Sequence, residues 1–537
     1  MNTVAAAVVS QLKALGVKRV FGIPGGPWIP FMESMRNNGM DFILVSNEAS
    51  AGFMADVTAR LTGIPGVCHG TFGPGATNLS TGVGGGTLDR SALLALTSEV
   101  PDSMLDRTTQ MKIDQQALFR PLTKATCRLT AEKAAQQVFD FMQIAVEGVP
   151  GAVHIGVPSS MANAPCPDDV VFRPLARTKA APAPSADIEQ LAQAVGNSKY
   201  PLIALGLRVA EEGFVPQLME LAEKLGAPVV LTPMAKGVFP EDHPCYQGVL
   251  FHALSDRLIP TIAKADLIIG IGYDPVEFNY EAWIPIATPL AHVDIVPVDI
   301  EEGYAVISEV VGDLGASIRA MIDVATPSRW TQKELHEAPA LIRSGLKAFR
   351  DRFGPTSALH VLREVMEEDG IMTCDVGAHI HLIGQCWRTP KPRLQLMTNG
   401  WSSMGFGIPA AIAAKLCRPD VHVACVTGDG GFLMMAGEIV TARRLKLNVV
   451  FVVLADRKLS LISVKQDWQQ VPRYETDLYD GEFLKADTVF GAPVLRAAND
   501  AEMELALRKA FSMDGPVVVE AVVDGIEYET LVTRKYK

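Results

Sequence analysis

Residues 421–462 read VHVACVTGDGGFLMMAGEIVTARRLKLNVVFVVLADRKLSLI. Their first part, Val421–Thr427, is apolar and β-branched, which predicts a buried strand, and a glycine-rich turn follows it. Leu433–Arg444 has helical periodicity, and Val449–Leu454 predicts a second buried strand that ends just before Asp456. The stretch therefore predicts a βαβ unit with an acidic turn after its first strand.

Each of the two predicted strands is followed by an aspartate, Asp429 in the first turn and Asp456 in the second. Parallel strands joined by one helix end at the same edge of the sheet, so both carboxylates should face one crevice. The neighbouring Gly428, Gly430 and Gly431 let backbone N–H groups approach a phosphate. The Asp429 carboxylate would repel a bare phosphate. A Mg²⁺ or Ca²⁺ ion between them would offset this repulsion, because hard cations prefer oxygen ligands. The alternative is an ordinary glycine turn with a surface aspartate.

The spacing of this segment resembles the diphosphate signature of thiamine diphosphate enzymes. GDG is followed by a helix, a strand and an Asp 27 residues after the first, although the usual closing pair of Asn is here Ala455-Asp456. The resemblance implies that thiamine diphosphate binds at Gly428–Gly431 and near Leu461, with Mg²⁺ held by Asp429, Asp456 and the backbone carbonyl of Lys458.

Composition limits the classes of function. The chain has 537 residues, of which 48% are hydrophobic and 20% charged, so it can bury several large cores. A net charge of −12 argues against a nucleic-acid partner, and no apolar run is long enough to predict a membrane span. The eight cysteines are scattered without a CxxC pair, and the N-terminus lacks a signal-peptide pattern, which together predict a cytoplasmic enzyme with reduced thiols.

Helix and strand signals alternate along the whole chain and predict an α/β protein with three doubly wound parallel-sheet domains, at 1–165, 188–325 and 357–537. A Pro- and Ala-rich linker, 164–187, and a partly helical connection, 326–356, separate them. This order resembles the branch of thiamine diphosphate enzymes that includes pyruvate oxidase and acetolactate synthase. The resemblance implies pyrimidine-binding, central and diphosphate-binding domains. It also implies a homodimer or homotetramer whose active sites lie at the subunit interface.

Thiamine chemistry needs one carboxylic acid that exchanges a proton with the aminopyrimidine ring of the cofactor. Glu48 starts a predicted helix in the segment SNEASAGFMADVTARLTG, residues 46–63. On its own it reads as a helix-start glutamate stabilised by the helix dipole. The segment is, however, similar to the family's catalytic-glutamate motif, which implies that Glu48 is the catalytic acid.

A second segment, NGWSSMGFG at 399–407, resembles the part of the family that bends the cofactor. The resemblance implies that Met404 is the wedge under the bent cofactor and that the Ser402 carbonyl accepts from its amino group. Met404 could equally be plain core packing. His379 matches a position that contacts the diphosphate, and a surface or capping histidine is the alternative.

On the substrate side, Gly26 follows Pro24-Gly25 and resembles an oxyanion donor. The resemblance also implies that Pro24 contacts the cofactor, and that Asn78 does so from GPGATN at 73–78. Gln110 matches an active-site Gln of catabolic acetolactate synthases and benzaldehyde lyase, where it would hydrogen-bond the hydroxyl of the intermediate.

The chain also departs from acetolactate synthases. His69 stands where they usually carry an apolar residue; benzoylformate decarboxylase resembles this chain there and uses its His in proton transfer. His69 could instead simply hydrogen-bond the backbone. Lys465 could pair with a substrate carboxylate or point to water. Leu205-Gly206-Leu207 lacks the three-glycine run expected at an FAD site, which argues against FAD.

The sequence thus predicts a thiamine diphosphate- and Mg²⁺-dependent carboligase, similar to acetolactate synthase. It would decarboxylate a 2-oxo acid and add the product to a second carbonyl compound to form a 2-hydroxy ketone. The alternatives within the family are a non-ligating decarboxylase and a 2-hydroxy ketone or aldehyde lyase. The alternative outside it is a non-catalytic regulatory subunit, for which the presence of Glu48 and Asp429 is unfavourable.

Overall fold

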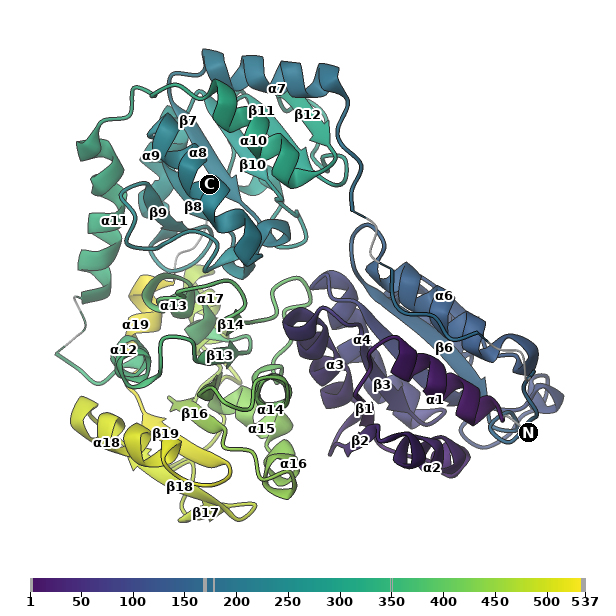
Figure 1. The fold of residues 1–537 in the computed structure, drawn as a ribbon. Coiled ribbons are helices and arrows are strands. Elements are labelled where there is room, and N and C mark those ends of the chain that lie inside the picture. The colour runs from purple at the N-terminus through teal and green to yellow at the C-terminus, as the bar shows by residue number, and fades with distance from the viewer. Residues whose placement is uncertain (1–2, 168–170, 177–178, 348, 350, 533–537) are drawn as a thin grey trace.

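Three β-sheets, each with helices on both faces, organise the computed structural model of the protein (Figure 1). The structure describes residues 3–167, 171–176, 179–347, 349 and 351–532. The predicted α/β class with three parallel sheets is confirmed. We refer to the parts built on the three sheets as the first, middle and third units.

The first unit contains a fully parallel sheet in the order β2-β1-β3-β4-β6-β5. Cores on both faces of this sheet are apolar, with α1 and α2 on one side and α3 and α4 on the other. Its strands are β1 (Arg19–Gly22), β2 (Asp41–Leu44), β3 (Gly66–Gly70), β4 (Leu93–Glu99), β5 (Thr126–Arg128) and β6 (Ala152–Pro158). Its helices are α1 (Val4–Ala14), α2 (Ile29–Asn38), α3 (Glu48–Thr62), α4 (Pro74–Leu88), α5 (Gln115–Phe119) and α6 (Ala134–Val146).

The middle unit has a second parallel sheet in the order β12-β11-β10-β7-β8-β9. Its strands are β7 (Pro201–Leu205), β8 (Val229–Leu231), β9 (Tyr246–Val249), β10 (Leu267–Ile271), β11 (Leu290–Asp294) and β12 (Val306–Val311). Its helices are α7 (Ser185–Asn197), α8 (Val215–Leu225), α9 (Ile259–Lys264) and α10 (Leu314–Val324), and the connection that follows contains α11 (Gln332–Lys347).

The third unit has the order β14-β13-β15-β16-β19-β18-β17, parallel except for the short antiparallel edge strand β17. Its strands are β13 (Ile371–Cys374), β14 (Gln395–Leu396), β15 (Val423–Gly428), β16 (Val450–Ala455), β17 (Thr488–Val489), β18 (Ala492–Ala497) and β19 (Val517–Val522). Its helices are α12 (Pro355–Val365), α13 (Ala378–Cys386), α14 (Gly407–Cys417), α15 (Asp429–Met435), α16 (Glu438–Arg444), α17 (Ser460–Trp468), α18 (Asp500–Phe511) and α19 (Ile526–Leu531).

The βαβ unit of residues 421–462 forms as predicted, with β15 and β16 parallel and Gly428 opposite Leu454. The helix between them differs from the prediction of one helix over Leu433–Arg444. It begins at Asp429, directly after the strand, and is divided into α15 and α16 by Ala436-Gly437. The helical periodicity missed the first turn because glycines there carry no apolar signal.

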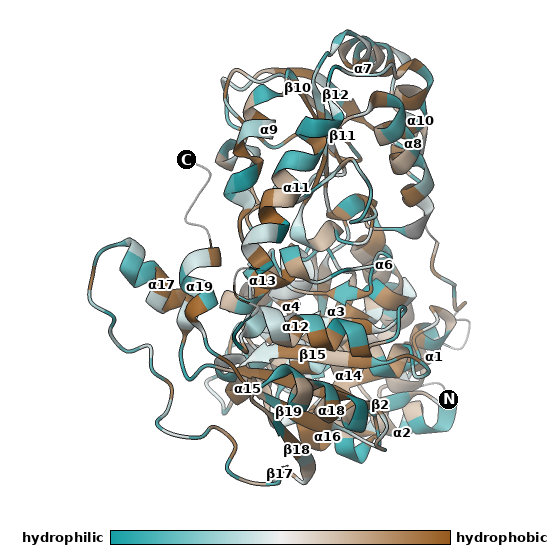
Figure 2. Cartoon of the chain, turned by 90° about the vertical axis from the view of Figure 1, so that its left-hand side faces the viewer, coloured by the Kyte–Doolittle hydropathy of each residue, from teal (hydrophilic) through white to brown (hydrophobic). Residues whose placement is uncertain are grey.

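The first and third units pack against each other through α3 and α14 (Figure 1). Phe53 of α3 meets Phe406, just before α14, with ring centroids 5.5 Å apart. The two units therefore share one continuous apolar core. Figure 2 shows hydrophobic residues on the central strand β15 and hydrophilic ones on outer helices such as α2.

The middle unit is joined to the first by a buried chain of ion pairs. Arg90 donates to both oxygens of Asp274 at 2.7 and 3.0 Å, and Arg208 donates to Asp274 and, at 2.7 Å, to Asp294. Both aspartates are almost wholly buried. We call these four residues the Arg–Asp chain.

All eight cysteines lie in the described residues, and five of them are buried while three are half-buried. Within those same residues, no helix is both long and apolar enough to cross a membrane.

Candidate active site

The GDG turn brings Asp429 to the carboxyl edge of the third sheet. Asp429 is the first residue of α15 and is buried. Its Oδ1 accepts from Gly430 N at 2.9 Å, and its Oδ2 accepts from Arg457 N at 2.7 Å. Asp456, the residue before Arg457, follows β16, and its Oδ1 accepts from Lys458 N at 3.3 Å. The two aspartates therefore flank one edge of the sheet, as the βαβ pattern predicts.

The charges at this edge favour a bound cation. Burial raises the pKa of the Asp429 carboxyl. Burial and the nearby Asp429 charge raise the pKa of Asp456 to about 6. A divalent cation would relieve this repulsion, and the oxygens of Asp429 and Asp456 suit Mg²⁺. No group of three or more His, Cys, Asp or Glu side chains is gathered for a metal in the described parts of the chain, so backbone oxygens such as that of Lys458 would complete such a site.

Asp375, which the sequence analysis missed, is the hub of the same edge. It follows β13, next to β15 in the sheet, and is buried. Its Oδ2 accepts from Gly405 N at 2.7 Å and from Thr427 Oγ1 at 3.2 Å, and its Oδ1 lies 3.2 Å from His379 Nε2. A Cβ added to Gly431 would lie 2.0 Å from Asp375 Oδ2, so this position needs glycine. An acidic residue after the strand adjacent to β15 was the available signal.

The predicted wedge segment lies against the GDG turn. The Met404 Cε lies 3.1 Å from the position of a Cβ on Gly430, and the His379 ring lies 3.6 Å from that on Gly428. Ser402 adopts a left-handed backbone with φ of 53°, and its Oγ donates to Asn399 O at 2.7 Å. The structure thus brings Met404 and His379 to the predicted diphosphate turn.

Residues from later in the chain also lie against this turn, and the Leu459 Cδ2 lies 3.0 Å from the position of a Cβ on Gly430. The Tyr479 hydroxyl donates to Asp429 Oδ2 at 3.0 Å. Leu461, predicted to contact the cofactor, is half-buried in the first turn of α17. Tyr479 lies in an irregular segment 50 residues after Asp429, and no periodic pattern in the sequence points to it.

Glu48 is buried at the start of α3, where Asn47 caps the helix by accepting from Ala49 N at 2.8 Å. Glu48 Oε2 accepts from Asn78 Nδ2 at 3.1 Å. A Cβ on Gly75 would come within 3.2 Å of Glu48 Oε1, so the GPGATN loop lies directly against this carboxylate. The structure therefore brings Glu48 and Asn78 together.

The predicted substrate-side residues lie on more open surface. Gly26 is exposed at the start of a short 3₁₀ helix, Gly26–Trp28, and Pro24 is half-exposed before it. Gln110 is exposed in a loop, and the next residue, Met111, packs on Gly73 of the GPGATN loop. The GPGATN loop therefore lies between Glu48 and the loop that carries Gln110.

His69 occupies a different environment. It is fully buried in β3, its ring stacks on Trp28 with centroids 3.8 Å apart, and its Nδ1 lies 3.0 Å from Leu96 O. Burial lowers the pKa of His69 to about 3. Trp28 belongs to the core under α1 and α2, on the opposite face of the sheet from α3 and Glu48. These contacts match the alternative in which the ring hydrogen-bonds the backbone, and the catalytic role of His69 stays a prediction.

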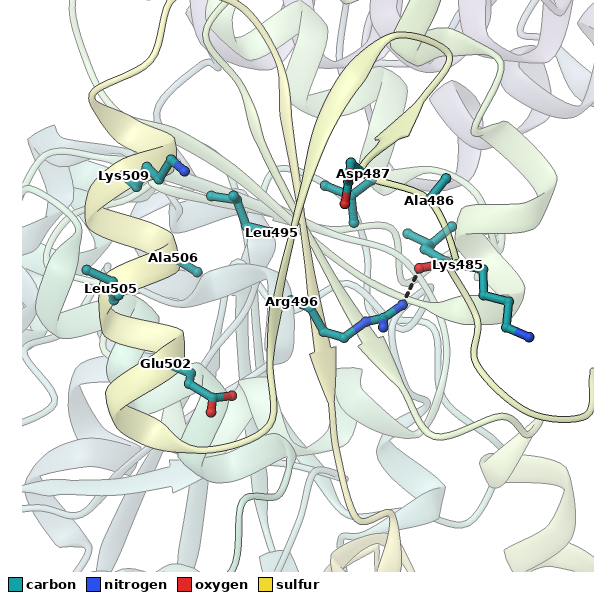
Figure 3. A pocket seen from close by; sticks show the side chains of 11 residues that line it. Lys485, Ala486, Asp487, Leu495, Arg496, Glu502, Leu505, Ala506 and Lys509 are labelled. Carbon is teal, nitrogen blue, oxygen red and sulfur yellow. Dashed lines mark hydrogen bonds between the residues drawn. The ribbon is translucent and has the colours of Figure 1, made fainter.

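A hollow of about 360 Å³ on the outer side of the third unit contains none of these residues (Figure 3). It lies between α18 and the strand β18. Arg496, at its centre, donates from Nε to Glu520 Oε2 at 2.9 Å and from Nη2 to the Leu484 carbonyl. Lys465 is exposed on α17 and does not reach this hollow.

Comparison with known proteins gives matches along nearly the whole chain. The N-terminal, central and C-terminal domains of the thiamine pyrophosphate enzyme family match residues 2–118, 188–321 and 375–521. A probable acetolactate synthase large subunit of Methanocaldococcus jannaschii is 31% identical, covering 97% of this chain and 92% of its own. An acetolactate synthase of Bacillus subtilis is 30% identical, covering 97% and 93%. A catabolic acetolactate synthase of Raoultella terrigena is 29% identical, covering 96% and 94%.

Proposed function

This chain belongs to the thiamine pyrophosphate enzyme family, as an enzyme of the acetolactate synthase type, and from that premise we propose that it decarboxylates a 2-oxo acid and joins the product to a second carbonyl compound. The product is a 2-hydroxy ketone, with acetolactate from two pyruvates as the leading case. The division into functional domains at 1–165, 188–325 and 357–537 and a cytoplasmic location are part of this proposal.

The single observation that carries the proposal is the buried Glu48 carboxylate, fixed by Asn78 at the head of α3. When bound, thiamine diphosphate supplies a carbon nucleophile at its thiazolium ring. Glu48 would hold and exchange the proton at the pyrimidine ring through one carboxyl oxygen, while Asn78 fixes the orientation of the other. Met404, which packs against Gly430 of the GDG turn, would be the apolar wedge on which the cofactor rests.

We assign diphosphate binding to the turn Gly428–Gly431 with His379 beside it, and Mg²⁺ binding to Asp429, Asp456 and the Lys458 carbonyl. The mutually repelling carboxylates, of which Asp429 is buried and Asp456 half-buried, and the glycine-lined turn support this assignment. Asp375 would support the same site indirectly, because it holds Gly405 and His379.

We further propose that the active site lies between two subunits, with Glu48 from one and Asp429 from the other, in a homodimer or homotetramer. Leu433 and Met434, in α15 directly after the GDG turn, are 56% and 57% exposed in the single chain, and such apolar exposure favours a protein interface. Gly26 and Gln110 would then meet the substrate at this interface, Gly26 as an N–H donor and Gln110 as a side-chain partner.

We propose that FAD is not required. The cavity between the three units, of about 630 Å³, includes Arg90 and Arg208 in its wall. Both guanidinium groups are already committed to the Arg–Asp chain, which leaves them poorly disposed to bind the phosphates of a dinucleotide.

The first test is incubation of the purified protein with thiamine diphosphate, Mg²⁺ and pyruvate, with and without FAD. Acetolactate and CO₂ without FAD would support the proposal. CO₂ with free acetaldehyde would favour the non-ligating decarboxylase, and the absence of turnover would require a panel of other 2-oxo acids and of 2-hydroxy ketones.

The second test is Glu48→Gln, which keeps the size and the contact with Asn78 but loses the acid. We expect retained cofactor binding and a loss of turnover of about 10²-fold or more. Activity like that of the wild type would refute the role of Glu48.

A further inference from the structure

Two buried carboxylates, one on the first unit and one on the third, connect these units. Each accepts hydrogen bonds from consecutive backbone N–H groups of the other unit. We propose that these residues, Glu438 and Asp89, are reciprocal positioning residues. In this proposal Glu438 of the third unit sets the position of Glu48, and Asp89 of the first unit sets that of the Ser402–Met404 segment. The inference rests on the proposed function and deepens it.

Glu438 begins α16 and is 1% exposed. Its Oε1 accepts from Ser46 N at 2.8 Å and from Asn47 N at 3.1 Å, the two residues directly before Glu48. Its Oε2 accepts from Thr441 Oγ1 at 2.7 Å, which fixes the carboxylate plane.

Neighbouring contacts reinforce this attachment. Ser46 Oγ donates to Gly437 O at 2.9 Å, and Ser50 Oγ lies 3.3 Å from Met435 Sδ. The turn between β2 and α3 is therefore held from the end of α15 and the start of α16. That turn sets where α3 begins, and so where the Glu48 carboxyl lies.

Asp89 makes the reverse contact from the C-terminal end of α4. It is 3% exposed, and its Oδ1 accepts from Asn399 N, Gly400 N and Trp401 N at 3.1, 2.8 and 3.3 Å. Its Oδ2 lies 3.3 Å from Arg60 Nη2. Three converging N–H groups on one oxygen fix the turn that leads into Ser402.

Packing around this turn leaves little freedom. A Cβ on Gly84 would meet the Trp401 ring at 2.7 Å, so the indole lies directly on α4. Hydrogen bonds to a charged acceptor are stronger than neutral ones, and their loss in a buried place leaves donors unsatisfied. The two carboxylates thus hold backbone within a few residues of the groups that meet the cofactor, without touching the cofactor themselves.

In the proposed dimer, each chain contributes to both cofactor sites. The third unit of a chain would serve one cofactor site and its first unit would serve the other. Glu438 and Asp89 therefore connect the two sites of the dimer through each chain.

The test measures backbone protection first, in the cofactor-free protein. Glu438→Ala should speed amide hydrogen exchange at residues 46–47, and Asp89→Ala should do so at 399–401, each by about tenfold or more. Neither measurement needs cofactor or substrate.

Kinetic and binding measurements then separate positioning from general stability. Glu438→Ala should lower kcat about tenfold or more, with KM for the 2-oxo acid and the Kd of thiamine diphosphate changed less than about twofold. Asp89→Ala should instead raise the Kd of thiamine diphosphate about tenfold, because it releases the wedge segment. Glu438→Gln, which keeps an acceptor oxygen, should restore kcat to within about threefold of the wild type.

Asp266 in the middle unit provides a control away from the site. It is an exposed carboxylate whose two oxygens accept from Lys199 N and Tyr200 N, each at 2.9 Å, so it also holds consecutive backbone N–H groups, but within one unit. Asp266→Ala should speed local exchange but leave kcat and cofactor affinity unchanged. If Glu438→Ala does not fold, Glu438→Asp retracts the carboxylate by one methylene and tests the same contact.

Faster exchange at 46–47 with an unchanged kcat would overturn the positioning role of Glu438. An equal loss of kcat in Asp266→Ala would also overturn this role, because the loss of kcat would then not be specific to the contact of Glu438. Failure of the proposed function looks different: wild-type protein would then bind no thiamine diphosphate, whatever the amide exchange reports.

Discussion

Glu277 in the middle unit should make the stability of that unit depend strongly on pH. Its side chain is buried, with Oε1 accepting from Met234 N at 2.8 Å, while Oε2 has no hydrogen-bond partner among the described residues. Burial, with smaller contributions from nearby Asp274 and Asp89, raises the pKa of Glu277 to about 8 from its usual 4.5. The folded protein therefore holds this proton at pH 7, and the unfolded chain does not.

The direction in which stability changes with pH follows from this difference in proton binding. Because the folded form binds the Glu277 proton more tightly, the stability that this proton contributes is fully present below about pH 4.5 and is lost as the pH rises through about 8. Each pH unit in that window changes the free energy of unfolding by about 1.4 kcal/mol, so the whole range approaches about 5 kcal/mol before local relaxation reduces it. Glu277→Gln keeps the acceptor for Met234 and removes the titration.

Amide hydrogen exchange of β10 between pH 5.5 and 8.5, corrected for intrinsic rates, reports the opening of the middle unit alone. Wild-type protection should fall relative to that of Glu277→Gln as the pH rises, by up to about tenfold per pH unit. A ratio of protection that stays constant over this range would refute the assignment of a protonated Glu277.

Two further perturbations address the third unit. Asp429→Ala removes one of two facing carboxylates and should weaken Mg²⁺-dependent binding of thiamine diphosphate about a hundredfold or more, as measured by titration calorimetry; unchanged affinity would remove Asp429 from the metal site. Gly431→Ala would place a Cβ 2.0 Å from Asp375 Oδ2, so we expect a loss of about 1–3 kcal/mol in denaturant unfolding and weaker cofactor binding. The control Gly196→Ala, in α7 where the described residues leave the Cβ position free within 4 Å, should be neutral or slightly stabilising, and equal costs for the two variants would contradict the steric argument.

The fold was largely predictable because its signals are local. Buried strands such as β15 and β16 are continuous apolar runs, and the turns after them carry glycine. The division of the helix between them was not predictable, because the apolar periodicity continues across Ala436-Gly437 although the helix does not.

The candidate site was predictable only in part. Short contiguous motifs that resemble those of the family contain Glu48, Asn78, Asp429 and Met404, so these residues could be predicted from the sequence. Tyr479, Asp89 and Glu438 act through contacts between distant segments, and a single carboxylate or hydroxyl far along the chain gives no periodic signal. Asp375 could have been predicted, because it directly follows a buried strand, as the turn of Asp429 does. Gly26 and Gln110 face open surface in one chain, so the roles that the resemblance implies for them stay predictions.

The Arg–Asp chain has a consequence for recombining this protein with its relatives. Two arginines and two aspartates are balanced there, with Arg90 from the first unit and the other three from the middle unit. Removing one member of a buried pair leaves an uncompensated charge, at a cost of about 3–5 kcal/mol. A chimera that imports the middle unit from another enzyme must therefore also carry a matching residue at position 90, and natural substitutions at these four positions should occur in concert.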